Sequence, residues 1–389
     1  MAEWISKTLG ELTSFISKGI PPKYVDEKNE NTIRVLNQKC NRNFEISYNE
    51  SRIHNAAVKK VPENKLLHSG DVLINSTGTG TAGRVAQIFN IPMPTTVDGH
   101  MILLRPTKEI DPLYYGYVIK SYQKKIESLA EGSTGQTEIN RQRLQDEIYI
   151  TFPKDRALQK EIGTFLFQID EKIKNNSEIN NNLEQQAQAI FKSWFIDFEP
   201  FSNRKPSEWS VSTLGNVSIM GAGGDKPQNV SPIKTDLYEY PIYSNGLSNE
   251  GLYGFTDKPK ISEESVTVSA RGTIGFVCLR HIPYVPIVRL VTLIPKPEII
   301  SAKYLYLWLK QLHITGTGTT QQQLTVPDFQ KTEILVPSQE IVTLFTATVE
   351  PIFEKIWFNQ NENEKLSSLR DTLLPKLMTG ELDVSDIEI

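Results

Sequence analysis

Two segments of the chain carry hydrophobic residues at alternating spacings of three and four positions. In the first they are Ile162, Leu166, Ile169, Ile173, Leu183, Ala187, Ile190 and Trp194, and in the second they are Phe345, Val349, Ile352, Ile356, Leu366, Leu373 and Leu377. A period of 3.5 residues that is sustained over several heptads is typical of a coiled coil. The pattern predicts two long helices, and the stretch from Ile162 to Trp194 would span about 50 Å at about 1.5 Å per residue.

Asparagines interrupt both helical patterns at the same place. Asn176 and Asn180 stand where hydrophobic residues are due in the first segment, and Asn359 and Asn363 do so in the second. One interpretation is a pair of solvated turns. The other is an antiparallel pair of helices in which Asn176 faces Asn363 and Asn180 faces Asn359, since one register satisfies both pairs. Buried asparagines at such positions fix register and orientation at a cost in stability.

The rest of the chain has the pattern of sheets. Short alternating or hydrophobic runs such as DVLINS, HMILLRP, SVTVSA and VRLVTLIP are separated by Gly and Pro, with few helical pieces such as AKYLYLWLKQL. This pattern is typical of a mixed, sheet-centred α+β domain. We therefore expect a sheet-containing globular part before each of the two helices.

The chain also contains an internal repeat. WISKTLGELTSF from Trp4 reappears as WSVSTLGNVSIM from Trp209, and IDEKI at 169–173 reappears as IFEKI at 352–356. Self-similarity of this kind indicates one architecture used twice. The expected fold class is α+β, with two globular domains joined by two long antiparallel coiled-coil helices about a pseudo-two-fold axis. The expected boundaries are 1–153 and 204–337 for the globular domains, 154–203 for the central helix, and 338–389 for the C-terminal helix and tail.

Composition narrows the class of protein. Hydrophobic residues make up 39% and charged residues 23% of the 389 residues, which is typical of a globular protein. No apolar run approaches the roughly 18 residues of a membrane helix, and the N-terminal sequence lacks the order of a signal peptide. We therefore expect a cytoplasmic protein with no membrane partner. Cys40 and Cys278 lie far apart and indicate neither a zinc site nor a disulfide framework.

Several motifs resemble one known family. They are QAIFKSWFIDFEP and LSSLRDTLLPKLMTGELDV at the helix ends, SKGIPPKY and RVLNQKCNRN in the first globular part, and PIYSNG and ARGTIG in the second. The chain resembles the specificity subunit (HsdS) of type I restriction–modification systems over essentially its whole length. The resemblance implies that each globular part is a target recognition domain that reads one half of a bipartite double-stranded DNA sequence. It also implies that the helices space the halves and dock two methyltransferase subunits.

The same resemblance implies that restriction subunits join this core and that catalysis belongs to the partners. S-adenosylmethionine, ATP and Mg would then be bound by partner subunits and not by this chain. The sequence agrees, because it has no D/N-P-P-Y/F methylation motif, no GxxxxGK[ST] phosphate loop and no metal-ligand cluster among its five His residues. Alternatives are a specificity subunit for a fused restriction–methylation enzyme and an orphan DNA-binding scaffold.

A glycine loop offers a further alternative, a nucleotide-binding enzyme. Gly78, Gly80 and Gly83 have the GxGxxG spacing of dinucleotide sites, but such sites also need a helix directly after the loop. The following RVAQIFNIPMP alternates and reaches prolines, which predicts a second strand. The related sequence VSARGTIGF lacks the spacing. We expect a hairpin in both copies, with Arg84 or Arg271 at the turn, that approaches DNA or shapes the sheet.

The candidate DNA contacts are cationic or amide side chains in loops, because Arg and Lys suit guanine and phosphate while Asn and Gln suit adenine. In the first domain they are Lys18, Lys23, Tyr24, Gln38, Lys39, Arg42, Asn43, Arg84, Gln136, Asn140, Arg141 and Arg143. In the second they are Lys226, Ser244, Asn245, Arg271, Gln321 and Gln322. For each of them a solvated or turn-capping role is the alternative. Because the two sets differ in chemistry, we expect an asymmetric target.

Hydrophobic residues at the ends of the two helices are candidates for docking the methyltransferase subunits. They are Trp194, Phe195 and Phe198 at the end of the first helix, and Leu374, Leu377 and Met378 at the end of the second. This role is implied by the family resemblance. The alternative is that each helix end packs into a domain of the chain itself.

Overall fold

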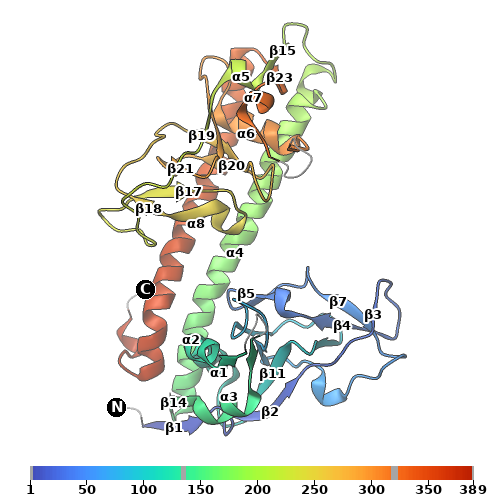
Figure 1. Ribbon diagram of the computed structural model, residues 1–389, viewed down its shortest axis with the longest axis vertical. Helices are drawn as coiled ribbons and strands as arrows, with labels where there is room; N and C mark the ends of the chain where they lie inside the picture. The colour runs from blue at the N-terminus through green and yellow to red at the C-terminus, as the bar shows by residue number, and fades with distance from the viewer. Residues whose placement is uncertain (1–2, 133–136, 317–322, 388–389) are drawn as a thin grey trace. The chain divides into compact units, whose positions relative to one another are not determined.

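The computed structural model describes residues 3–132, 137–316 and 323–387. It divides into two compact units (Figure 1). Unit 1 comprises Met1–Asn176 and Asn361–Ile389, and unit 2 comprises Ser177–Gln360. Two long helices, α4 (Arg156–Phe195) and α8 (Gln339–Thr379), contribute to both units. Each unit therefore contains one globular part and a section of both helices.

Unit 1 contains two four-stranded sheets. One has the strand order β2-β11-β8-β9 and is antiparallel, and the other has the order β10-β4-β7-β3 with a parallel β4–β10 pair. The strands of these sheets are β2 (Thr13–Lys18), β3 (Tyr24–Val25), β4 (Thr32–Leu36), β7 (Arg52–Asn55), β8 (Val72–Asn75), β9 (Val85–Gln87), β10 (Thr95–Val97) and β11 (Met101–Pro106). Shorter pairings join β1 (Trp4–Thr8) to β14 (Tyr149–Pro153), β5 (Asn41–Arg42) to β6 (Glu45–Ile46), and β12 (Ala130–Glu131) to β13 (Glu138–Ile139). The helices of the globular part are α1 (Pro112–Ser121), α2 (Gln123–Ser128) and α3 (Arg141–Glu147).

Unit 2 repeats this plan with one strand fewer in its second sheet. Its antiparallel sheet has the order β16-β22-β19-β20, and its second sheet, β18-β17-β21, contains a parallel β17–β21 pair. The strands are β15 (Ser210–Thr213), β16 (Ser218–Ala222), β17 (Tyr240–Tyr243), β18 (Leu252–Thr256), β19 (Ser265–Val268), β20 (Val277–Arg280), β21 (Val285–Pro286), β22 (Val291–Pro295) and β23 (Glu333–Val336). The helices are α5 (Leu214–Val217), α6 (Ala302–Gln311) and α7 (Val326–Phe329). The predicted α+β fold class and the predicted repeat are thus both confirmed.

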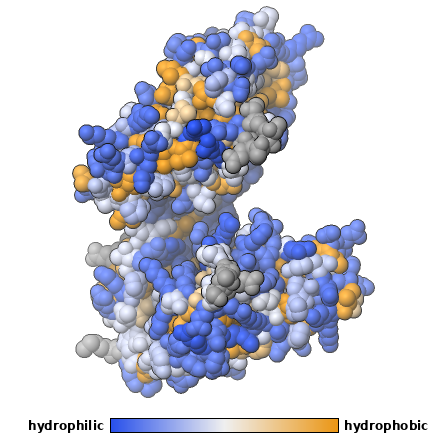
Figure 2. Space-filling view, viewed as in Figure 1, coloured by the Kyte–Doolittle hydropathy of each residue, from blue (hydrophilic) through white to orange (hydrophobic). Residues whose placement is uncertain are grey.

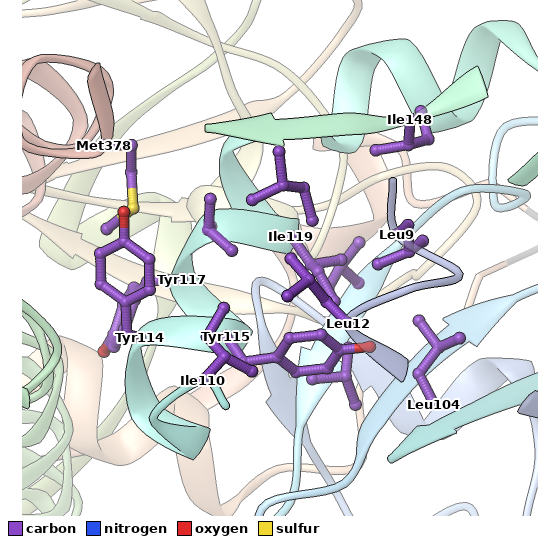
Figure 3. Packing of buried hydrophobic residues seen from close by; sticks show 14 of the residues in the cluster. Leu9, Leu12, Leu104, Ile110, Tyr114, Tyr115, Tyr117, Ile119, Ile148 and Met378 are labelled. Carbon is purple, nitrogen blue, oxygen red and sulfur yellow. The ribbon is translucent and has the colours of Figure 1, made fainter. Parts of the chain in front are cut away.

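The helix before the last strands of each unit supplies much of the core. In unit 1, Asp111 caps the N-terminus of α1 and Pro112 occupies its first turn, a favourable pair of residues for starting a helix. Figure 3 shows Tyr114, Tyr115 and Tyr117 of this helix in one cluster with Met378 of α8. All four side chains are buried, and each stabilises the fold by roughly 1.5–3 kcal/mol through the apolar area it removes from water.

The two long helices run antiparallel within each unit, and the asparagines meet in two pairs. In unit 1 the Asn176 amide donates to Oδ1 of Asn363 at 2.9 Å, and it also donates to Glu362. In unit 2 the Asn359 amide donates to Oδ1 of Asn180 at 2.8 Å. Asn176 and Asn359 are 2% and 1% exposed. These are the pairs of the antiparallel interpretation, and the buried asparagines are not solvated turns.

Candidate nucleic-acid interface

The glycine loop of unit 1 is a hairpin turn. Val72 of β8 pairs with Gln87 of β9, and no helix follows the loop, so the structure lacks the helix N-terminus that a dinucleotide site needs. Gly78, Gly80 and Gly83 all have positive φ, the backbone conformation that glycine adopts most easily. In unit 2 the same turn joins β19 to β20. The predicted strand, turn and strand are therefore present in both copies.

Several loops meet the glycine loop at one end of the antiparallel sheet of unit 1. The Thr77 hydroxyl lies 2.9 Å from Nδ1 of His100, and Thr77 forms a backbone bridge with Glu138. Glu138 in turn pairs with the amine of Lys18 at the end of β2. The side-chain oxygen of Gln38 accepts from Thr77 at 3.5 Å. We call this group, together with Arg141, loop cluster 1; its members are Lys18, Gln38, Thr77, His100, Glu138 and Arg141.

Loop cluster 1 borders a polar hollow of about 650 Å³. Its lining includes Lys18, Glu138 and Arg141, together with amide side chains of α3. Burial and the nearby charge of Arg141 lower the pKa of Lys18, and the same two causes lower the pKa of Lys65. Since these cations repel one another, a bound anion would relieve the repulsion and favour their charged forms. Two carboxylates, Glu131 and Glu138, also line the hollow and pair with Arg143 and Lys18. No ion pair of the described residues includes Arg141, so its charge is available to a negatively charged ligand such as a phosphate.

Two candidates next to this hollow are engaged within the chain. The side-chain oxygen of Asn140 accepts from the main-chain N–H groups of Gln142 and Arg143, at 2.8 and 3.4 Å, so Asn140 caps α3. The guanidinium of Arg143 is paired with Glu131 and Glu147. The turn-capping alternative thus describes Asn140, and the charge of Arg143 is already compensated.

The remaining candidates of unit 1 lie on the second sheet or its loops. Lys23, Lys39, Arg42 and Asn43 are exposed. The half-buried ring of Tyr24 lies under the Arg52 guanidinium at 3.6 Å, which makes it a stacking partner inside the chain. Arg84 donates to the main-chain oxygen of Gly80 at 3.1 Å and folds back over its own loop. Gln136, Gln321 and Gln322 lie outside the described residues.

In unit 2, Asn245 holds two loops together. Its side-chain oxygen accepts from the N–H of Ala270, and its amide donates to the main-chain oxygen of Val288, both at 2.7 Å. Both ends of the amide are thus engaged within the chain, so Asn245 positions these loops. Ser244 donates to the main-chain oxygen of Gly251 at 3.4 Å. Lys226 is exposed and lies 5.9 Å from the ring of Tyr253.

Matching backbone hydrogen bonds identify equivalent positions in the two units. In unit 1 the bonds run from Gly19 N to Met101 O, from Asp98 N to Leu36 O, from Gly83 N to Asn75 O and from Ile139 N to Ser76 O. In unit 2 their counterparts, in the same order, run from Gly223 N to Leu290 O, from Ile287 N to Tyr243 O, from Gly275 N to Ser269 O and from Leu324 N to Ala270 O. The caps of α3 and α7, Asn140 and Thr325, also match. Position by position, loop cluster 1 then corresponds to Ala222, Asn245, Arg271, Arg289, Gln323 and Val326, which we call loop cluster 2.

This correspondence corrects one expectation about the turns. Arg84 precedes β9 directly and aligns with Phe276, whereas Arg271 aligns with Thr77 at the other end of the loop. The two arginines are therefore not equivalent. Arg271 is exposed and donates to the side-chain oxygen of Gln323 at 3.0 Å.

Sequence reasoning missed Lys65, His100 and Arg289. Lys65 donates to the main-chain oxygens of Lys18 and Gly19, so only long-range folding brings it to the cluster. His100 and Arg289 could have been found, since both are charged or titratable residues at the start of the hydrophobic runs HMILLRP and RLVTLIP, which form the equivalent strands β11 and β22. Neither residue belongs to a sequence motif of its own.

The proposed docking residues need a correction. Phe195 is 1% exposed, and its ring centre lies 4.9 Å from those of Tyr304 and Phe345 in the core of unit 2. Trp194 and Phe198 are half-buried against the same core. In unit 1, Leu374, Leu377 and Met378 are 7%, 0% and 4% exposed. Buried side chains are not available to a partner, so the alternative, in which each helix end packs into a domain, describes Phe195, Leu374, Leu377 and Met378. Trp194 and Phe198 pack on the core but keep an exposed part.

The face shown in Figure 2 is largely hydrophilic, with hydrophobic patches on both units. Exposed hydrophobic side chains of unit 2 include Ile233, Leu237, Tyr253 and Val288. The described part of the chain has no group of three or more His, Cys, Asp or Glu side chains placed to hold a metal ion. No helix among the described residues is long and apolar enough to cross a membrane.

Comparisons with known proteins agree with the repeated architecture. Among curated relatives, the type I restriction enzyme MjaIX specificity subunit of Methanocaldococcus jannaschii is 26% identical, over 99% of this chain and 95% of the relative. The HindI specificity subunit of Haemophilus influenzae is also 26% identical, over 98% of this chain and 100% of the relative. The crystal structure of a type I restriction–modification S subunit from M. genitalium has the same fold, with a TM-score of 0.60 and 18% identity over 97% of this chain and 96% of that one.

The family model of the type I restriction modification DNA specificity domain matches the chain twice, at residues 1–185 and 206–368. Each match contains one antiparallel sheet and one loop cluster. The chain therefore belongs to the family of type I restriction–modification DNA specificity subunits and carries two copies of the family's domain.

Proposed function

We propose that this chain selects the DNA target of a type I restriction–modification complex, with unit 1 reading one half of a bipartite sequence and unit 2 reading the other. The observation that carries the proposal is the duplicated loop cluster. The two clusters occupy the same end of two equivalent antiparallel sheets, one in each unit, but they present different side chains. Two recognition surfaces that share a framework and differ in chemistry suit two different half-sites.

The paired helices suit the role of a spacer. Within each unit, α4 and α8 are joined by a buried asparagine pair that a shifted register would break. We propose that this register sets the separation between the two recognition surfaces, as reading two half-sites on one duplex requires. We propose that two methyltransferase subunits dock on the outer faces of these helices, and that restriction subunits join the assembly. The complex would act in the cytoplasm.

Catalysis is assigned to the partner chains in this proposal. S-adenosylmethionine would bind to the methyltransferase subunits, and ATP and Mg would serve the restriction subunits. This chain would contribute binding energy and target choice alone. Equilibrium dialysis of the purified chain with S-adenosylmethionine, ATP and NAD should accordingly detect no binding, and binding of any of the three would contradict this assignment.

The proposal is tested by mapping methylated adenines in DNA modified by the chain together with its methyltransferase subunits. The expected result is methylation at a bipartite, asymmetric sequence with a spacer of constant length. The double variant Lys18→Gln, Arg141→Gln should change only one half of that sequence. It should also reduce the slope of log affinity against log salt by up to about 2 if both side chains contact phosphates. A palindromic target, or no bipartite target, would overturn the proposal.

A further inference from the structure

The turn between β21 and β22 of unit 2 has an unusual backbone. Val288 and Arg289 have φ values of 53° and 60°, in the left-handed region that glycine adopts easily and other residues rarely. Val288 is β-branched, so it fits this conformation especially poorly. At the equivalent turn of unit 1, neither Gly99 nor His100 has a positive φ. The strained backbone is therefore a property of unit 2 and not of the shared framework.

The surrounding loops hold this turn in place. The N–H of Val288 donates to the oxygen of Gly224 at 2.9 Å, and the N–H of Arg289 donates to the oxygen of Gly223 at 2.8 Å. The oxygen of Val288 accepts from the Asn245 amide at 2.7 Å. A strained backbone persists where its surroundings determine it fully, and such places are often functional sites. Asn245 is accordingly a positioning residue for the turn.

The turn presents its side chains outward. Val288 is 49% exposed, and Arg289 is exposed beside it. No ion pair among the described residues includes Arg289 or Arg271. Asn245 bonds to Val288 on one side and to Ala270, the neighbour of Arg271, on the other. Two uncompensated guanidinium groups thus lie on loops that one amide ties together.

Unit 1 places its cations elsewhere in the same framework. Where unit 2 has Arg271 and Arg289, unit 1 has Thr77 and His100. Where unit 1 has Lys18 and Arg141, unit 2 has Ala222 and Val326. The positive charges therefore occupy complementary positions of two equivalent loop clusters. A duplex lying across each cluster would meet its cations at different places.

We infer that the Val288–Arg289 turn is a base-reading element of unit 2, in which Arg289 donates to the O6 and N7 atoms of a guanine while Arg271 contacts the same half-site. The planar, two-pronged guanidinium matches this edge of guanine, and the exposed Val288 side chain suits a neighbouring thymine methyl group. The inference rests on the proposed function, and it names the residues that give unit 2 its preference.

The inference is tested by selecting randomised duplexes with the full chain, bound to its methyltransferase subunits, and sequencing the bound DNA. Arg289→Gly removes the guanidinium and puts glycine where φ already favours it, so the turn should keep its backbone. The preference of this variant for one G·C pair in one half-site should fall about tenfold or more, and its preference in the other half-site should stay unchanged. Arg289→Lys should keep most of the affinity for DNA but lose much of the preference for that G·C pair, because a lysine ammonium lacks the two-pronged geometry of a guanidinium.

Arg204→Ala is the matched control, since Arg204 is exposed in the same unit but lies outside loop cluster 2. It should leave both half-sites unchanged. Thermal unfolding of Arg289→Gly should show no loss of stability. An unchanged half-site preference in Arg289→Gly, or an equal change in both halves, would overturn this inference alone. Selection of no bipartite sequence by the unaltered chain would instead overturn the proposed function.

Discussion

Loop clusters 1 and 2 are built on equivalent backbones but differ in where they carry charge. Cluster 1 gathers Lys18 and Arg141 around a polar hollow, with Glu138 as a partial counter-charge. Cluster 2 has no lysine or arginine at those two positions and presents Arg271 and Arg289 instead. The framework supplies the hairpin, the parallel strand pair and the helix cap in both units. The side chains of the clusters thus differ between the units, while the strand pairing beneath them is the same.

The two units also differ in how the helix ends are anchored. Unit 2 receives the C-terminal end of α4 through aromatic rings, whereas unit 1 receives the end of α8 through Leu374, Leu377 and Met378.

Phe195→Ala should destabilise unit 2 by about 3–5 kcal/mol, because it leaves a cavity among aromatic rings. Leu377→Ala should destabilise unit 1 by about 2–5 kcal/mol for the same reason. Urea unfolding gives both values. Phe358→Ala is the matched control, since Phe358 lies on α8 but is 61% exposed, and it should cost little. Equal effects of Phe195→Ala and Phe358→Ala would contradict the anchoring described here.

The asparagine pairs should respond to single and double substitution in opposite ways. Asn359→Ala in unit 2, or Asn176→Ala in unit 1, should cost about 1–3 kcal/mol, because the partner amide loses a buried hydrogen bond. Asn176→Leu with Asn363→Leu should restore stability but loosen the register. Spin labels at the exposed positions 174 and 365 would report this as a broadened distance distribution. A single narrow distribution in the double variant would show that the asparagines do not set the register.

The contacts that α1 and α6 make with α4 should give the units different pH dependences. Burial alone would raise the pKa of Glu184, but the hydrogen bond from Tyr306 and the charge of Lys310 outweigh it and hold that pKa below its ordinary value. The stabilisation of the folded state that comes from this lowered pKa is complete above pH 4.5, the ordinary pKa of a glutamate, and it is lost as the pH falls below that value. In unit 1, burial lowers the pKa of Lys120 to about 8, although Asp170 lies 3.6 Å away. Stability should therefore rise as pH increases from about 8 towards the ordinary lysine value of 10.5.

Urea unfolding at several pH values checks both effects. Trp194, Trp209, Trp308 and Trp357 lie in unit 2 and only Trp4 lies in unit 1, so tryptophan fluorescence reports mainly on unit 2. Glu184→Gln should remove the acid-sensitive contribution, worth about 1–2 kcal/mol. Lys120→Met should remove the alkaline gain. If either variant keeps the pH profile of the unaltered chain, the corresponding contact does not titrate as described.

The smallest effect is expected at the tips of the two glycine loops. Gly80 and Gly272 both have φ of +70°, and a side chain added to either would meet no atom within 4 Å. Gly80→Ala and Gly272→Ala should therefore cost about 1 kcal/mol each, from backbone strain alone. Thermal unfolding measures the difference. Gly83→Ala should cost more, since its added carbon would lie 2.7 Å from Cα of Glu127, and equal costs at Gly80 and Gly83 would contradict the described packing.

Features that depend on local periodicity could be predicted from the sequence. The long helices follow from their hydrophobic seams, the duplicated sheets from the repeat, and the hairpin at Gly78–Gly83 from the strand-like residues after it. The asparagine pairing also follows, since one register satisfied both pairs. Because the sequence motifs of the first half return in the second half, the repeat also predicts that one domain architecture occurs twice.

Features that depend on tertiary packing could not be predicted. Phe195 and Leu377 are large hydrophobic residues of the kind that docking surfaces use, and only their contacts in the structure show that they are core residues. Asn140 and Asn245 have the chemistry of adenine readers, but the side-chain oxygen of Asn140 and both ends of the Asn245 amide bond to main-chain groups. The left-handed backbone at Val288 and Arg289 depends on bonds to Gly223 and Gly224, which are distant in sequence.

The central claim, that the two loop clusters read different half-sites, can be tested directly by site-specific photo-crosslinking. A photoreactive side chain is placed at position 141 in one variant and at position 289 in another, within the full chain bound to its methyltransferase subunits and its selected duplex. The account predicts that crosslinks from position 141 map to one half-site and those from position 289 map to the other. Crosslinks from both positions to the same half-site, or to neither, would contradict it.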